Sequence, residues 1–184
     1  MVPAPEPHHT DRGGLATRLG AAVLASADNA GLAPTGMLEV QAQPWGGRTW
    51  GRLSVEDTEG KSLRLGRGDV KWTRFAMGAG AVVDLGTGTG RLGTSLRGDL
   101  LLSRVSVQGD GFAINRQGTV WQAGADFGLR FHLSLSPRAS VWIDLSAMAW
   151  PGQQVLSAGN VTNTQTLPAL EGRLGLGGTF PLTP

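Results

Sequence analysis

Apolar and polar residues alternate with a period of two along most of this chain, which is the pattern of β-strands with two different faces. The clearest case is residues 121–135, where Phe127, Leu129 and Phe131 alternate with Asp126 and Arg130. Weaker alternation marks the N-terminal segments. We expect eight strands, at about residues 15–26, 37–43, 48–56, 74–85, 92–102, 121–135, 140–149 and 170–180.

The links between these segments alternate between long and short. The short links are residues 44–47, 86–90 and 136–138. The long links are residues 27–36, 57–70, 108–118 and 151–167. Tight turns at one rim and free loops at the other are typical of a barrel threaded through a bilayer.

We therefore predict an all-β fold, an eight-stranded antiparallel up-and-down (meander) transmembrane β-barrel. Residues 14–182 form its single domain, and residues 1–13 form a flexible, proline-rich N-terminal tail. The strand number is even, so both termini belong at the rim that carries the short turns.

The polar faces of the expected strands carry arginine and carboxylates in similar numbers, interleaved with glycine. The planar guanidinium pairs with carboxylates through two hydrogen bonds, and an eight-stranded barrel is only wide enough for side chains inside. We expect a lumen filled by a network of ion pairs. Its predicted members are Arg18, Arg52, Arg74, Asp84, Arg97, Asp99, Asp126, Arg130, His132, Asp144, Glu171 and Arg173.

The apolar faces then point toward lipid. The predicted lipid-facing residues are Phe75, Leu96, Phe127, Leu129, Phe131, Leu133, Ile143, Leu145, Leu174 and Leu176. Trp45, Trp72, Trp121 and Trp150 lie near segment ends, where tryptophan suits the headgroup layer. Trp50 and Trp142 fall on the polar face and are expected to fill the lumen.

Two alternatives remain open at this stage. A soluble, lipocalin-like barrel that binds an apolar ligand would turn Phe127, Phe131 and Leu133 inward. An enzyme could use His132, which lies near Ser134 and several carboxylates in the pattern, in a serine–histidine–acid relay.

Composition excludes several other classes. The chain has no cysteine, so no disulfide or thiolate metal site can form, and we expect no metal or cofactor. The formal net charge is only +2 and no basic stripe is present, which argues against nucleic acid as a partner. No apolar run approaches the ~18 residues of a membrane helix. Residues 1–12 lack the apolar stretch of a signal peptide, so we expect any leader to be missing from this chain.

With this alternation, strand number and loop rhythm, residues 15–182 resemble the small eight-stranded outer-membrane barrels of Gram-negative bacteria, the OmpA/OmpX-like class. Phe180 is the nearest counterpart of the terminal aromatic residue of that class. The resemblance implies an outer-membrane location, with lipid and lipopolysaccharide as neighbours. It also implies a non-enzymatic structural or surface-recognition role, with a protein or surface partner at loops 57–70, 108–118 and 151–167. Some members modify lipids, which keeps a lipid-modifying enzyme as a further alternative.

Overall fold

A computed structural model describes residues 16–28, 31–43, 47–65, 68–86, 91–110, 117–152, 155–158 and 163–182. The expected tail at residues 1–13 lies outside these ranges. The described part contains no helix that is long and apolar enough to cross a membrane. Ten strands are present: β1 (Ala16–Asp28), β2 (Gly31–Gln43), β3 (Thr49–Leu65), β4 (Gly68–Asp84), β5 (Leu92–Asp110), β6 (Gln117–Ser136), β7 (Ala139–Ala149), β8 (Val155–Ala158), β9 (Asn163–Thr166) and β10 (Leu170–Pro181).

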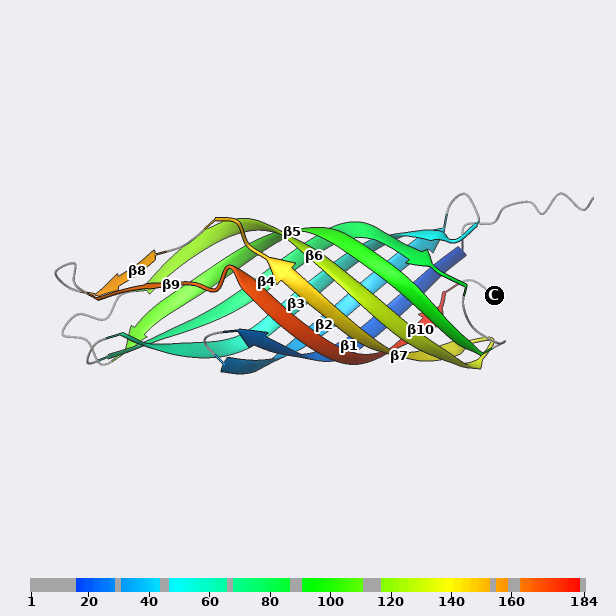
Figure 1. Ribbon diagram of the computed structural model, residues 1–184, viewed down its shortest axis with the longest axis horizontal. Helices are drawn as coiled ribbons and strands as arrows, with labels where there is room; N and C mark the ends of the chain where they lie inside the picture. Colours follow the sequence, from blue (N-terminus) through cyan, green and yellow to red (C-terminus); the bar gives the residue numbers. More distant parts are fainter. Residues whose placement is uncertain are drawn as a thin grey trace, which may run out of the picture.

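Eight of these strands close into a barrel, in the order β1-β10-β7-β6-β5-β4-β3-β2 (Figure 1). Every neighbouring pair is antiparallel, and closure comes from the pairing of the first strand with the last, for example Val23 with Leu176. The remaining strands, β8 and β9, form a separate two-stranded sheet. The predicted eight-stranded meander barrel is confirmed.

The short links lie at the same end of the barrel as the beginning of β1 and the end of β10. We call this the short-turn end, and the opposite end the long-link end. Two of its turns use glycine in the left-handed region of the backbone, with φ of 86° at Gly47 and 66° at Gly86. A side chain would be strained at both positions.

The predicted long loop at residues 27–36 is wrong. Strand β1 continues to Asp28 and β2 begins at Gly31, with Ala27 opposite Leu32 and Ala25 opposite Pro34. The alternation is invisible in the sequence because small residues occupy both faces here. Proline is tolerated because this part of β2 pairs with β1 only; pairing with β3 begins one residue later, at Thr35.

The predicted loop at residues 57–70 is also wrong. Strand β3 runs to Leu65 and β4 begins at Gly68, with a register shift in β3 between Thr58 and Lys61. Both faces of this segment are polar along much of its length, so it offers no contrast between faces for period-two reasoning to detect. The predicted loop at residues 108–118 is wrong at its ends, where residues 108–110 and 117–118 belong to β5 and β6; residues 111–116 lie outside the described residues. The predicted loop at residues 151–167 contains the β8–β9 hairpin.

The barrel wall therefore has an uneven height (Figure 1). Strands β3 to β6 reach well beyond the β1–β2 hairpin at the long-link end, and β8 and β9 lie at that end as well. We call the projecting part of β3–β6 the extension. It comprises residues 59–65, 68–74, 105–110 and 117–120.

Glycines facing the lumen make room for large side chains on neighbouring strands. A Cβ atom at Gly177 would overlap the Trp142 ring and lie 2.6 Å from the Ala21 carbonyl oxygen. On the same strand, a Cβ atom at Gly172 would meet nothing within 4 Å.

We expect Gly177→Ala to destabilise the barrel by about 1–3 kcal/mol through overpacking. The matched variant Gly172→Ala should be neutral or slightly stabilising, because β10 already holds an extended backbone there. Reversible urea unfolding of both variants measures the difference. Equal stabilities would mean that the Trp142 ring does not fill the space over Gly177.

Candidate functional site

The interior of the barrel is charged and its exterior is apolar. Arg97 and Asp144 inside are 1% and 0% exposed, whereas Leu145, the next residue along β7, is 57% exposed on the outside. The predicted lipid-facing residues all lie on this outer face, with Leu96 and Leu129 half-buried and the others exposed. The soluble-barrel alternative required Phe127, Phe131 and Leu133 to point inward, so it is wrong.

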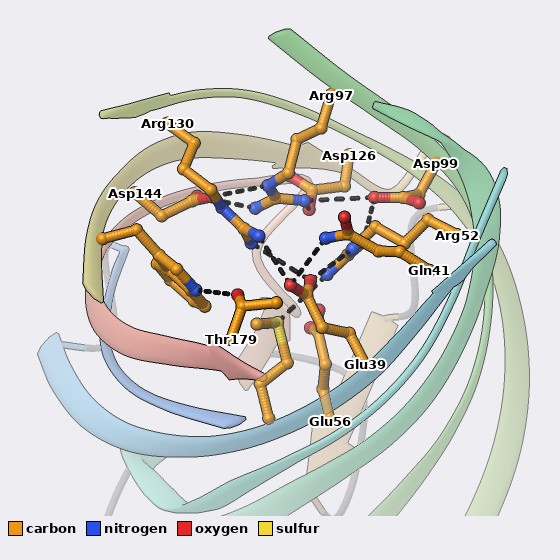
Figure 2. A network of polar contacts seen from close by, with 12 residues as sticks. Glu39, Gln41, Arg52, Glu56, Arg97, Asp99, Asp126, Arg130, Asp144 and Thr179 are labelled. Carbon is orange, nitrogen blue, oxygen red and sulfur yellow. Dashed lines mark hydrogen bonds and ion pairs between the residues drawn. The ribbon is translucent and has the colours of Figure 1, made fainter. Parts of the chain in front are cut away.

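A closed ring of six alternating charges crosses the middle of the lumen (Figure 2). Arg97 donates from Nε and Nη2 to the two oxygens of Asp144, at 2.8 Å each. Arg130 donates to Asp144 at 3.1 Å and to Glu39 at 2.5 and 3.1 Å. The members, in order of contact, are Glu39, Arg52, Asp99, Arg97, Asp144 and Arg130. We call this set the central ring.

Five strands supply the central ring, so it ties together distant parts of the wall. Arg52 on β3 donates to Glu39 on β2 at 2.7 Å and also contacts Asp99 on β5. A branch leaves the ring through Asp126, which pairs with both Arg97 and Arg173. Arg173 in turn pairs with Glu56. Arg52, Arg97, Arg130 and Arg173 thus each contact at least two carboxylates, which compensates the burial of their charge.

A second cluster lies nearer to the long-link end. Lys61 donates to Asp28 at 2.6 Å and to the Ser26 hydroxyl at 3.3 Å, and lies 3.9 Å from Glu171. Glu171 also accepts from Ser26 and pairs with Arg74. The Arg74 guanidinium is packed between two indoles, 5.0 Å from the Trp72 ring centre and 4.2 Å from that of Trp150.

These positions correct part of the prediction that the tryptophans at segment ends lie in the headgroup layer. Trp72 and Trp150 are each only 1% exposed and lie inside the barrel, because their rings stack on Arg74. Trp121 is 55% exposed on the outer face, as expected for an interfacial residue. Trp45 lies outside the described residues. Trp50 and Trp142 are buried in the lumen, as the polar face predicted.

Three of the predicted network members lie apart at the short-turn end. The Arg18 guanidinium lies 3.7 Å from the ring centre of Trp50, whose indole donates to Asp84 at 3.2 Å. His132 is half-buried over Gly93, where a Cβ atom would overlap its Nε2. Among the described residues, the Asp144 carboxylate pairs with Arg97 and Arg130, so it is not the acid partner of His132 that the enzyme alternative would use.

The structure adds four charged residues that were absent from the predicted network: Asp28, Glu39, Glu56 and Lys61. The alternation placed Glu39 and Glu56 on the inner face and so could have found them. Lys61 follows the register shift in β3, and Asp28 lay in a segment interpreted as a loop. A strict period of two could therefore identify neither Lys61 nor Asp28 as a lumen residue.

A buried apolar cluster, which we call the apolar cap, lies toward the long-link end. Leu167 follows β9 in the chain and is 2% exposed. It packs against Trp72 and Val105. Half-buried Leu63, Val107 and Val120 surround this cluster. The described residues contain no group of three or more histidine, aspartate or glutamate side chains that could hold a metal ion.

Comparison with known proteins supports the fold and gives no family. No protein-family model and no curated protein sequence matches this chain. Among solved structures, a major outer membrane protein from Thermus thermophilus superposes with a TM-score of 0.66 at 13% identity, covering 92% of this chain and 100% of that one. Neisserial surface protein A gives 0.59 at 14% identity, covering 91% and 97%. The attachment invasion locus protein Ail of Yersinia pestis gives 0.53 at 12% identity, covering 91% and 97%.

Removing one member of the central ring should leave each of its two partners buried with one counter-charge fewer. We expect Arg130→Met to cost about 3–5 kcal/mol, and the double variant Arg130→Met/Glu39→Gln to cost clearly less than the sum of the single variants. Glu39 is a suitable partner for this test because Arg130 donates two hydrogen bonds to it.

The exposed pair Lys71–Asp110 is the matched control. Its atoms are 3.4 Å apart, and both side chains are about 60% exposed. Its coupling energy should stay within about 0–1 kcal/mol. Reversible unfolding of the two double-mutant cycles measures both couplings, and additive effects at Arg130 and Glu39 would contradict a coupled interior.

Proposed function

We propose that this protein is an integral outer-membrane β-barrel with a non-enzymatic, structural or surface-recognition role. One observation carries the proposal: the charges of the closed barrel face inward, while the outward face is apolar up to one row of residues and polar beyond that row. A barrel in water has no reason to arrange its wall in this way, whereas a barrel in a bilayer requires it.

The strand register gives the position of this boundary along β4, β5 and β6. Outward-facing Met77, Leu102 and Ala123 lie side by side in one row across β4, β5 and β6. Four residues further along each strand, toward the long-link end, the corresponding residues are Thr73, Ser106 and Thr119. A single row therefore separates an apolar wall from a hydroxyl-rich one.

That separating row contains Phe75, Arg104 and Trp121, again side by side. Aromatic and arginine side chains with apolar bodies and polar tips suit the layer between hydrocarbon and water. From Phe75 to the end of β4 at Asp84 the strand has ten residues. A tilted strand needs ~9–11 residues to cross a membrane, so the apolar wall has the required length.

The filled interior supports a role other than the conduction of solutes. The central ring, the second cluster and the apolar cap follow one another along the lumen. An eight-stranded barrel leaves little space beyond such side chains. We propose that the ion pairs stabilise the barrel by holding its strands together.

In this proposal, membrane lipid and lipopolysaccharide contact the apolar wall, and recognition belongs to the long-link end. The extension and the β8–β9 hairpin stand above the boundary row. They include most of the segments predicted as partner-binding loops, now partly as rigid strands. A rigid scaffold that presents exposed polar residues is the usual basis of surface recognition.

Fractionation of the expressed chain tests the proposed location. We expect the full chain to partition into detergent and to run as two gel bands, a compact one without heating and a slower one after boiling. A soluble, monodisperse protein that is indifferent to detergent would overturn the proposal. An enzymatic activity toward lipid that His132→Ala abolishes would overturn only the non-enzymatic part.

A charge placed on the outer wall tests its contact with lipid. Leu145→Arg should cost about 2–4 kcal/mol of stability in a bilayer, because the guanidinium would enter hydrocarbon. The matched variant Thr73→Arg lies beyond the boundary row and should change stability by no more than about 0.5 kcal/mol. Unfolding from lipid vesicles measures both; a tolerated Leu145→Arg would mean that this face is solvated.

A further inference from the structure

Exposed charge is polarised along the barrel axis. The exposed carboxylates of the described residues all lie at the long-link end: Asp57, Glu59, Asp69 and Asp110. At the short-turn end the exposed charged residues of the described part are Arg48, Arg91 and Arg138. We call these three arginines the basic rim.

Each of the three short turns supplies one arginine, and the turns are neighbours. The amide of Asp84 donates to the Arg48 carbonyl at 2.8 Å, which joins the β2–β3 turn to the end of β4. The amide of Ser134 donates to the Arg91 carbonyl at 2.8 Å, which joins the β4–β5 turn to the last residues of β6. The Arg48 guanidinium lies over Gly86, 3.3 Å from where a Cβ atom would be.

No exposed carboxylate among the described residues neutralises the basic rim. Asp84 is the nearest acidic residue in the strand register, but it is half-buried, faces the lumen and accepts a hydrogen bond from the Trp50 indole. The rim is therefore a concentration of positive charge whose counter-ion is not part of the described protein.

An apolar wall adjoins these arginines. Leu92, directly after Arg91, is 61% exposed on the outer face, and Leu135, three residues before Arg138, is 56% exposed. Leu85, beside the turn that contacts Arg48, is 37% exposed. The arginine stems can thus lie along hydrocarbon while the guanidinium groups reach its edge.

We propose that the basic rim binds the phosphate groups of anionic phospholipids in the membrane leaflet at the short-turn end. This inference rests on the proposed membrane location. A guanidinium pairs with phosphate through two parallel hydrogen bonds, and the leucines beside it contact the acyl chains of the same lipid. Each arginine near an anionic surface should strengthen association about fivefold. The binding also fixes the depth of the barrel in the bilayer.

The test uses the full chain in phosphatidylcholine vesicles that contain spin-labelled phosphatidylglycerol or spin-labelled phosphatidylcholine. The fraction of motionally restricted label gives the relative association of the two lipids with the barrel. The rim variant is Arg48→Gln/Arg91→Gln/Arg138→Gln. The control, Arg64→Gln/Lys71→Gln, removes two exposed cations that lie beyond the boundary row instead.

We expect the wild type to prefer phosphatidylglycerol about twofold or more. The rim variant should lose this preference, the control should retain most of it, and 0.5 M salt should weaken it in the wild type, since exposed charges are screened at about 10 Å or less. Equal preference in the rim variant and wild type would overturn the inference. A rim variant that keeps the lipid preference of the wild type and loses binding to purified peptidoglycan would also overturn the inference.

The same experiment separates this inference from the proposed location. A barrel that inserts and restricts lipid without any preference contradicts the basic rim alone. A chain that restricts no lipid at all and shows no heat-modifiable band contradicts the membrane location itself. The heat-modifiable band also verifies that each variant is folded.

Discussion

Charge pairing inside a narrow lumen is the constraint on which the rest of this structure depends. A buried guanidinium or carboxylate without a partner is strongly destabilising, so every strand that carries one must be held in register with its partner. The central ring meets this need with three arginines and three carboxylates from five strands. A slip of one residue in any of these strands would turn its charges toward the outer wall.

The same constraint explains where glycine occurs. Arg97 and Trp142 need space above their neighbours, and Gly128 and Gly177 provide it: a Cβ atom at Gly128 would lie 3.0 Å from the Arg97 Nε. Glycine inside a strand weakens it in other proteins. Here the loss is offset by the large polar and aromatic side chains that the missing Cβ atoms admit to the interior.

Closure of the sheet and the uneven height of its wall divide the molecule by function. Most of the wall below the boundary row is paired with a neighbouring strand on both sides, as a hydrocarbon environment demands. The extension leaves the free edges of β3 and β6 above that row, where water or the β8–β9 region can satisfy the backbone. The extension has a polar outer face and encloses the apolar cap around Leu167, which is the arrangement of a barrel in water.

The sequence by itself determined the number of strands in the barrel, the inward and outward faces of the strands with strong alternation, and the short turns, because contrast between faces repeats every two residues. It failed at residues 27–36 and 57–70, where the two faces have similar polarity, and at Trp72 and Trp150, whose place at segment ends did not reveal their direction. Only the tertiary structure decided which charges meet. Strand tilt and barrel closure bring together residues as distant in sequence as Glu39 and Arg130, and no local pattern records that distance.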